Sequence, residues 1–446
     1  MVDEQECEKD GLTFKIHVIL LYLICAITYS LVAFHRSLPA ILSKEMTFEF
    51  GVDVSSLTSF SSMCYWAYAL MQPFGGLFAD IIDPRYLIGL ASILSGVGSM
   101  IISVSKKLSF AVVGRLIVGI GTGPIIIPII KLLTRRIPEE DFPLYNGLMA
   151  SFGGMGSILA QTPLKEFSSI YGWRISFLCI SGLSFLLGFL VILIVRKDPV
   201  CFGYPMIAKK PLNYDMEFSI REEFGILIKN LAIISKIPTF WLLSIQSMLH
   251  GGCLNNVLGL WGGPYIRDVF VGYDEAKVLT WISVSIIIGC VAMPILSKLC
   301  HTKKWIMFSN SILSFTMCTI IYFYDTKLSQ STLSFIFFIF GITNGSFPSL
   351  RGPCINDVCE PSFTGSMHGC ANFFSYFGGA LYQSFTGEMI SKYHPVNQKY
   401  SHNAYMNSLW IIVTASSFIS MFPPLFLYMK KSPDDSSHSL DDEQKV

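Results

Sequence analysis

Charged side chains are scarce in this sequence. Asp, Glu, Lys and Arg make up 14% of its 446 residues, whereas soluble globular proteins carry about 25%. The 32 basic and 31 acidic residues leave a net charge of +1 and form no basic stripe, which excludes a nucleic-acid partner. Hydrophobic residues make up 52% of the chain and the mean hydropathy is +0.53. This composition indicates a polytopic membrane protein surrounded by the lipid bilayer.

Catalytic and metal-binding patterns are also absent. The twelve cysteines are scattered, most of them inside apolar runs, and form no CxxC pair and no cluster with histidine. We interpret them as free, small hydrophobic side chains, so we expect no disulfide framework, no metal and no cofactor. No nucleophile–base pair and no phosphate-binding loop occurs, and we therefore expect that the protein is not an enzyme.

The start of the chain lacks the basic character of a secretion signal. Five acidic side chains lie between Asp3 and Asp10, whereas a cleavable signal peptide begins with a basic segment. We therefore expect the apolar run from Ile16 to Phe34 to be a retained membrane helix.

Apolar runs of about twenty residues, the length that crosses a bilayer, recur along the chain. We count twelve, with approximate cores at 16–38, 57–79, 86–104, 110–132, 144–164, 174–195, 239–262, 277–297, 304–324, 332–353, 364–389 and 407–428. They predict an all-α membrane protein with twelve transmembrane helices in two six-helix bundles. The predicted parts are an N-terminal tail (1–14), a first bundle (15–196), a linker (197–236), a second bundle (237–430) and a disordered C-terminal tail (431–446).

The linker suggests how the chain is oriented. It contains six Lys or Arg residues, and such residues favour the cytoplasmic side of a membrane. With both termini in the cytoplasm, 20 Lys and Arg lie in or beside cytoplasmic segments and 10 lie on the opposite side of the membrane. The remaining two, Arg36 and Arg115, lie within predicted spans. Plasma membrane and endolysosomal membrane both fit this arrangement.

The two halves also resemble each other. The segment from Gly119 to Gln161 aligns with the segment from Gly341 to Gln383 at a constant offset of 222 residues, with matching glycines inside it. Helices four and five therefore correspond to helices ten and eleven. Parallel repeats of this kind place a substrate site between two bundles.

A short loop between the second and third runs carries an acid and a base. Residues 76–85 read GLFADIIDPR, and the spacing of Gly76, Asp80 and Arg85 resembles the signature loop between helices 2 and 3 of the major facilitator superfamily. Gly76 permits a close helix approach, Asp80 can face the N-terminal end of the eleventh helix near residues 363–365, and Arg85 can anchor the cytoplasmic side. The second copy of the loop departs from the pattern, with Lys298 in the place of Asp80.

Arg36 lies in the outer half of the first run, and further apolar sequence follows it. An arginine within a span usually faces a water-filled path or a partner; the alternative is that it reaches the outer headgroups. Organic-phosphate antiporters of the family carry an arginine at this place. The closer likeness is to amino-acid and peptide-type facilitators, namely phagosomal amino-acid transporters of intracellular bacteria and lysosomal dipeptide transporters. It rests on residues 35–39 (HRSLP), 65–73 (YWAYALMQP), 161–163 (QTP) and 260–268 (LWGGPYIRD).

Other polar residues within the spans could line the same path. Tyr65, Tyr68 and Gln72 share one face of the second helix, and this face either borders the substrate or packs against aromatic neighbours. Gln161 and Gln383 occupy equivalent places in the two halves, where a buried amide needs hydrogen-bond partners. We favour a lining role for both glutamines over a shared packing role.

The seventh helix carries His250 and Asn255. A histidine in the middle of a membrane could couple proton movement, or it could simply be hydrogen-bonded within the fold. In organic-phosphate antiporters a second arginine stands near the position of Asn255, so its absence argues against a phosphate substrate. Arg115 in the fourth helix is by resemblance a structural or proton-coupling arginine, with a satisfied interface charge as the alternative. Arg351, near the end of the tenth run, is predicted to be a surface anchor.

Together these features predict a secondary transporter that works by alternating access, which we expect to be a monomer. Its predicted substrate is a small amino-acid-like molecule or dipeptide, held by Arg36 through its carboxylate, with protons as a candidate coupling ion. An organic-anion or organic-phosphate antiporter is one alternative, and a non-transporting receptor or partner protein with the same fold is another. The predicted substrate-binding residues are Arg36, Tyr65, Tyr68, Gln72, Gln161, His250, Asn255 and Gln383, and the predicted gating residues are Gly76, Asp80, Arg85 and Arg115.

Overall fold

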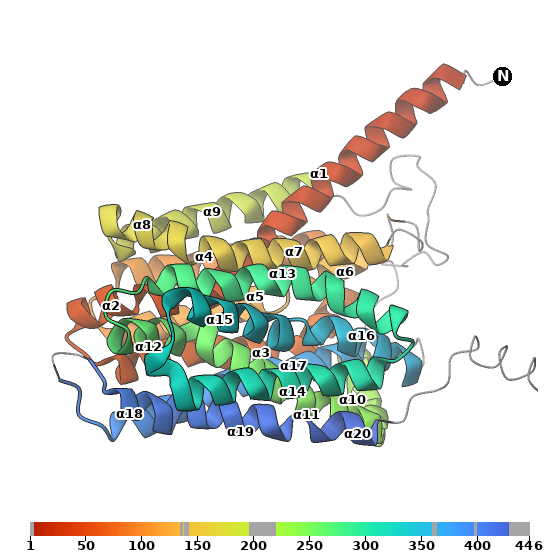
Figure 1. The fold of residues 1–446 in the computed structure, drawn as a ribbon. Coiled ribbons are helices and arrows are strands. Elements are labelled where there is room, and N and C mark those ends of the chain that lie inside the picture. The colour runs from red at the N-terminus through yellow and green to blue at the C-terminus, as the bar shows by residue number, and fades with distance from the viewer. Residues whose placement is uncertain are drawn as a thin grey trace, which may run out of the picture.

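The fold was obtained as a computed structural model, which describes residues 4–133, 137, 142–195, 220–358, 364–396 and 399–427. Within these ranges the chain is helical and forms no β-strand beyond one isolated bridge between Val396 and Lys399. The helices lie side by side along one direction (Figure 1). The predicted disordered tail at 431–446 lies outside the described residues.

The described part of the first half of the chain contains nine α-helices. They are α1 (Glu4–Ser37), α2 (Pro39–Phe50), α3 (Leu57–Ile81), α4 (Pro84–Val104), α5 (Leu108–Thr122), α6 (Ile126–Leu133), α7 (Phe142–Leu159), α8 (Thr162–Tyr171) and α9 (Trp173–Ile194). Helix α1 already begins inside the predicted N-terminal tail. Proline occupies the first or second position of α2, α4 and α8, where its missing N–H and fixed φ favour a helix start.

The second half begins with a helix inside the predicted linker. Its elements are α10 (Ile220–Ile234), α11 (Pro238–Asn256), the π-helical turn η3 (Val257–Trp261), α12 (Gly262–Val269), α13 (Glu275–Leu299), α14 (Lys303–Tyr324), α15 (Gln330–Gly345), α16 (Phe347–Val358), α17 (Thr364–Ser391), α18 (His402–Tyr405), the π-helical turn η5 (Met406–Trp410), α19 (Ile411–Ile419) and α20 (Phe422–Phe426). Short 3-10 turns lie at Val54–Ser56 (η1) and Asp325–Lys327 (η4).

The twelve predicted spans coincide with these helices or with end-to-end pairs of them. In the described part of the chain, eight helices are long and apolar enough to cross a membrane, and a ninth counts if the pair Phe224–Ile234 and Pro238–Val269, bent by 94°, is one span. The other three predicted spans are α3, α7 and α17, which carry more polar side chains because they lie where the bundles meet. The fold is therefore an all-α membrane architecture of two six-helix bundles.

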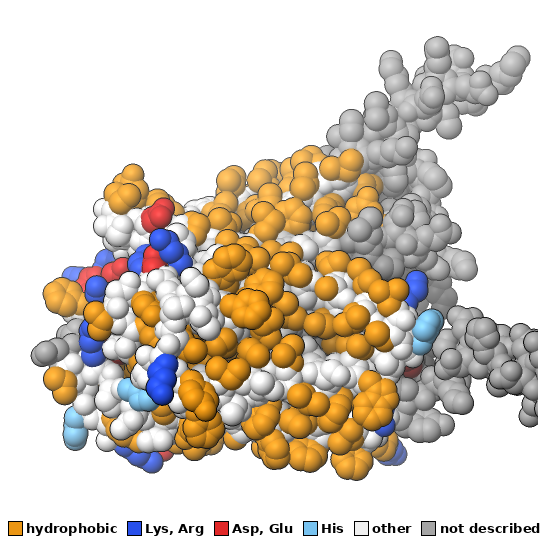
Figure 2. Space-filling view, viewed as in Figure 1, with side chains coloured by type: hydrophobic (Ala, Val, Ile, Leu, Met, Phe, Trp, Pro, Cys, Tyr) orange, Lys and Arg blue, Asp and Glu red, His pale blue; other side chains and the backbone are white. Residues whose placement is uncertain are grey.

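Two ends of the molecule can be told apart in Figure 1. We call the end with α8, α12 and α18 the distal end, and the end with α10, α16 and α20 the terminal end, because α1 starts and α20 finishes there. In Figure 2, hydrophobic side chains cover the middle of the visible face, and charged side chains gather toward the distal end. Exposed apolar side chains such as Phe189 and Leu193 on α9 are suited to lipid contact.

The internal repeat predicted from the sequence is visible in helix packing. A Cβ added to Gly156 on α7 would lie 1.9 Å from the carbonyl oxygen of Ser30 on α1, and one added to Gly378 on α17 would lie 2.4 Å from that of Met248 on α11. Small residues let membrane helices approach this closely. The same crossing is thus built twice, 222 residues apart.

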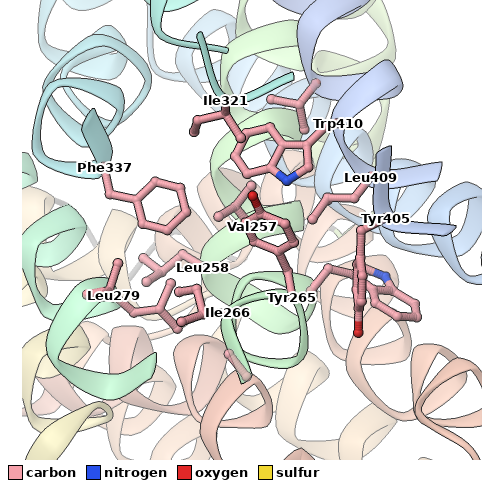
Figure 3. Packing of buried hydrophobic residues seen from close by; sticks show 14 of the residues in the cluster. Val257, Leu258, Tyr265, Ile266, Leu279, Ile321, Phe337, Tyr405, Leu409 and Trp410 are labelled. Atoms are coloured by element: carbon pink, nitrogen blue, oxygen red, sulfur yellow. The ribbon is translucent and has the colours of Figure 1, made fainter. Parts of the chain in front are cut away.

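Aromatic and aliphatic side chains pack together in the distal part of the second bundle (Figure 3). The ring of Tyr265 lies 5.3 Å from that of Trp410, which stacks on Phe337 at 6.0 Å. The Tyr265 hydroxyl donates to Asp325 Oδ2 at 2.9 Å, so its polar end is satisfied inside the cluster. This packing holds α12 firmly against the rest of its bundle.

Candidate functional site

The two bundles meet along a seam formed mainly by α3 and α17, with α7 against α13 beside it. Trp66 on α3 packs edge-to-face on Phe377 of α17 at 5.3 Å, and Tyr68 packs on Tyr376 at 4.4 Å. A seam between repeats is where transporters of this architecture bind their substrates. The sequence predicted polar residues here, and the structure shows which of them meet.

Arg36 extends from α1 into the seam. Its Nη1 donates to the Tyr376 hydroxyl at 2.5 Å, and its guanidinium carbon lies 5.2 Å from the ring centroid of Tyr68 and 4.9 Å from that of Tyr376. Tyr29 also interacts with the guanidinium. Arg36 thus points into the protein and does not extend toward the headgroups.

The charge of Arg36 has no acidic counterpart in the part of the chain that the structure describes. Among the ion pairs between described residues, none involves Arg36. Phenol hydroxyls and ring faces stabilise a guanidinium, but they do not neutralise it. A carboxylate or another oxyanion forms stronger, charge-assisted hydrogen bonds with arginine. Among the described residues, no carboxylate therefore offsets the positive charge of Arg36.

A second group of predicted residues adjoins Arg36. The Tyr65 hydroxyl donates to the backbone carbonyl of Arg36 at 3.2 Å, and Gln383 Nε2 donates to the carbonyl of Asn255 at 2.8 Å. Gly259 in η3 connects them, since a Cβ there would lie 2.6 Å from both the Tyr65 hydroxyl and Gln383 Nε2. Arg36, Tyr65, Tyr68, Asn255 and Gln383 therefore form one continuous region of the seam.

The other three predicted substrate-binding residues, Gln72, Gln161 and His250, lie apart from this region. Gln72 donates to the carbonyl of Gly123 at 3.0 Å, inside the first bundle. Gln161 is fully buried at the break between α7 and α8, and its amide has no hydrogen-bond partner among the described residues. The sequence placed Gln161 and Gln383 in equivalent positions, yet their surroundings differ.

His250 lies inside the second bundle. Its Nδ1 is 3.0 Å from Asn344 Oδ1, its Nε2 is 3.2 Å from Ser311 Oγ, and its ring stacks on Phe347 at 5.0 Å. Both ring nitrogens are thus hydrogen-bonded to neutral groups. This arrangement favours the second of the two roles predicted for His250, that of a hydrogen-bonded residue within the fold.

Arg115 is fully buried beside the site. Its Nη1 donates to the carbonyl of His35 at 2.7 Å and its Nε to the carbonyl of Phe60 at 3.3 Å, while the guanidinium lies 5.1 Å from the Phe60 ring. These bonds join α5 to α1 and α3 directly next to Arg36. The contacts are those of a structural arginine that positions the backbone at the site.

The predicted gating loop is described only in part. Arg85 contacts its own loop, where its backbone N–H donates to Asp83 Oδ1 at 3.0 Å and its side chain lies over Tyr86. Gly76 and Asp80 belong to α3, but their surroundings lie outside the described residues, as do residues 359–363 near the proposed contact of Asp80.

Arg351 is not a surface anchor, and that prediction was wrong. Its side chain is 3% exposed; Nη1 donates to Ser247 Oγ at 2.9 Å and Nη2 donates to Asn372 Oδ1. No local sequence signal marks this burial: no acidic residue stands within four positions of Arg351, but the same is true of the exposed Lys106 and Lys107. The predicted span at 332–353 placed Arg351 at the edge of the membrane, whereas the break between α15 and α16 leaves it inside the protein.

Charged side chains close the seam at the distal end. Lys165 of α8 donates to Asp274 at 2.8 Å and to Glu275 at 3.1 Å, across the two bundles. We call these three residues the distal latch. Nearby, Arg267 donates to Ser43 Oγ at 3.3 Å. The structure is therefore held shut on this side.

Removing the latch lysine should open the distal end. We expect Lys165→Gln to shift the population several-fold toward distal-open molecules, since a half-exposed ion pair contributes about 0.5–1 kcal/mol. Spin labels at Phe48→Cys and Val271→Cys, which lie in different bundles and are strongly exposed, would report longer distances. Lys277→Gln is the matched control, because Lys277 pairs with Asp274 inside one bundle. Unchanged distances in Lys165→Gln would contradict a latch.

Lowering the pH should open the distal end in the same way as Lys165→Gln. Partial burial acts to raise the pKa of Asp274. The hydrogen bond and positive charge of Lys165 outweigh it and hold this pKa below its ordinary value of 3.8. The ionised Asp274 stabilises the closed form fully when the pH is above the ordinary pKa of an aspartate. This contribution is lost as the pH falls through the lowered pKa that Asp274 has in the closed form. The wild-type distances should therefore stay constant near neutral pH and lengthen only below about pH 4.

Parts of this sequence resemble those of proteins that are named as transporters. A probable sulfoacetate transporter of Cupriavidus necator is 26% identical over 136 residues, which are 30% of this chain and 32% of that protein. A probable chloroplast anion transporter of Oryza sativa is 25% identical over 59% of this chain and 45% of its own length. A vacuolar membrane amino acid uptake transporter of Schizosaccharomyces pombe is 30% identical over 27% of this chain and 22% of its own length. Each match thus spans less than half of the relative.

Solved structures share the fold over nearly the whole chain. A bacterial homologue of the human lysosomal transporter Spinster, in an inward-facing and unoccupied conformation, superposes with a TM-score of 0.71 at 15% identity, over 92% of this chain and 96% of that one. The nucleoside transporter NupG superposes with a TM-score of 0.66 at 15% identity, over 91% and 99% of the two chains. The family model of the Major Facilitator Superfamily matches residues 19–382, and the chain belongs to this superfamily of membrane transporters.

Proposed function

We propose that this chain carries a small organic anion across a membrane by alternating access, with Arg36 as the residue that holds the anionic group. One observation carries this proposal: the Arg36 guanidinium lies in the seam, surrounded by tyrosines, with no acidic partner among the described residues. A partly buried charge without a counterion is costly, and an anionic substrate supplies the missing charge.

The surroundings of Arg36 suit an oxyanion. Arginine presents a planar set of N–H donors that can bind a carboxylate, sulfonate or phosphate through two hydrogen bonds. The hydroxyl oxygen of Tyr376 accepts from one of these donors, and an anion would offer Arg36 a stronger, charged acceptor. The relatives named as anion and sulfoacetate transporters support the same substrate class.

An amino-acid-like molecule or dipeptide is the second candidate. The aromatic faces of Tyr68 and Tyr376 and the amides of Asn255 and Gln383 could hold an ammonium group and a peptide bond. The amino acid uptake relative favours this candidate. The simple anion is preferred because no carboxylate of a described residue is paired with Arg36 or placed beside it to receive an ammonium group.

The positive-inside distribution of Lys and Arg supports a cytoplasmic position for both termini. In this orientation the distal latch faces away from the cytoplasm and the terminal end faces it. Facilitated uniport is the simplest transport mode consistent with the site, because the hydrogen bonds of His250 go to neutral groups.

Uptake by the purified protein in liposomes tests the proposal. The panel contains carboxylates, sulfonates and organic phosphates, together with free amino acids, dipeptides and sugars, each with and without a pH gradient. We expect saturable uptake of at least one organic anion and no uptake of sugars. Uptake of zwitterions alone would favour the second candidate, and binding without uptake would indicate a receptor. A requirement for the pH gradient would replace uniport by proton coupling.

A further inference from the structure

Helix α17 carries a stripe of polar side chains, of which Tyr376 lies in the seam. His368, Asn372, Tyr376 and Gln383 follow one another at spacings of four, four and seven residues, which places them on one face of the helix. Asn372 accepts a hydrogen bond from Arg351, and Tyr376 accepts one from Arg36. Two arginines, from α16 and α1, thus meet neighbouring turns of the same helix.

Tyr376 is a neighbour of both guanidinium groups. Asn372 and Tyr376 are four residues apart, so their Cβ atoms are separated by about 5–6 Å. The Tyr376 phenol interacts electrostatically with both Arg36 and Arg351. Like Arg36, Arg351 forms no ion pair with any described residue. Two positive charges therefore meet neighbouring residues of α17, and no described acidic residue pairs with either of them.

Arg351 differs from the structural arginine of this protein. Arg115 donates to the backbone carbonyls of His35 and Phe60, which remain in place as long as the helices do. Among the described residues, Arg351 donates to the side chains of Ser247 and Asn372 alone, and these side chains can rotate to other partners. Its Nε is buried without any hydrogen-bond partner among the described residues. Arg115 also has a buried donor without a partner among these residues, its Nη2. What sets Arg351 apart is that its hydrogen bonds go to side chains that can exchange partners, as expected of a ligand-binding residue.

We propose that Arg351 is a second anion-binding residue and that the substrate is a dianion, such as a short dicarboxylate, whose two acidic groups bind Arg36 and Arg351. This inference rests on the proposed function and narrows its substrate class. Tyr376 and Asn372 would lie between the two groups and donate or accept hydrogen bonds along the substrate. Because Arg36 belongs to the first bundle and Arg351 to the second, the dianion also joins the bundles across the seam.

Matched pairs of diacids and their monoamides test the second anchor. We would measure liposome uptake of succinate against succinamate and of glutarate against glutaramate, for the wild type, Arg351→Gln, Arg351→Lys and Arg36→Gln. The wild type should transport at least one diacid with a KM at least tenfold below that of its monoamide. Arg351→Gln should raise the diacid KM at least tenfold and leave that of the monoamide within twofold. Arg36→Gln should impair uptake of both.

The variants also separate binding from folding. Arg351→Lys keeps the buried charge but loses the fork of donors, so it should fold and retain an intermediate preference for the diacid. Arg174→Gln removes an arginine that pairs with Glu49 at the distal end and should leave the preference unchanged.

Three outcomes overturn the inference. Arg351 is not an anchor if the wild type prefers no diacid. The same follows if Arg351→Gln changes the uptake of the diacid and of its monoamide equally, or changes neither. In these cases, uptake that depends on Arg36 leaves the proposed function intact. If no anion of either kind is transported, the proposed function fails and the inference fails with it.

Discussion

Replacing Arg36 with Ala should abolish saturable anion uptake, with a loss of at least about a hundredfold in kcat/KM. A charge-assisted pair in a desolvated site is worth roughly 3 kcal/mol or more when one partner is removed, and this energy corresponds to about that factor. Initial uptake rates in liposomes, measured at several substrate concentrations, check the prediction. Normal uptake by the variant would disprove the role of Arg36 as the anchor.

Stability measurements separate this effect from misfolding. The Arg36 side chain is partly buried without a counterion, so its removal should leave the melting temperature unchanged or raise it slightly. Tyr376→Phe keeps the ring against Tyr68 and removes only the hydroxyl that binds Arg36; we expect a smaller loss, of about tenfold or less. A large drop in melting temperature for Arg36→Ala would mean that Arg36 serves the fold and not the substrate.

The helical architecture was predictable from the sequence because apolar length is a direct requirement of the bilayer. The twelve predicted cores coincide with helices, and the offset of 222 residues recovers two equivalent glycine crossings, at Gly156 and Gly378. The helix inside the linker, α10, was not predicted because the linker was treated only as a polar segment.

The partners of polar residues were harder to predict. Tyr65, Tyr68 and Gln72 share a helix face, yet the first two meet the seam while Gln72 binds the carbonyl of Gly123 in its own bundle. Helical spacing gives the direction of a side chain, but the neighbour at each height depends on how the helices cross. Pro73 directly follows Gln72 inside α3, and an internal proline bends a helix at this place.

The internal repeat was also a limited guide to the site. Gln161 and Gln383 are equivalent by offset, but among the described residues the side chain of Gln383 has a partner, the carbonyl of Asn255, and that of Gln161 has none. That carbonyl precedes the π-helical turn η3 of the second half, whereas the first half has a break at Leu38 and Pro39 in the corresponding region. Local backbone irregularities of this kind follow no simple periodicity, so the sequence pattern could not place them.

Substituting Leu for Gly156 should prevent stable folding. A single Cβ at this position would lie 1.9 Å from the carbonyl oxygen of Ser30, far inside van der Waals contact, and a leucine adds three more carbon atoms. Overpacking against a rigid backbone costs about 3 kcal/mol or more. We expect a fall in melting temperature of several degrees or more, or loss of the monodisperse protein in detergent.

The protein contains a matched control and a matched repeat for this experiment. Gly182 lies on α9 with open space around it, so Gly182→Leu should fold normally and could gain up to about 1 kcal/mol from better helix propensity. Gly378→Leu, which would clash with the carbonyl of Met248, should fail as Gly156→Leu does. A wild-type melting temperature for Gly156→Leu would mean that α1 and α7 do not cross this closely. Because α1 carries Arg36, such a result would also remove the geometric basis for placing Arg36 opposite Tyr376.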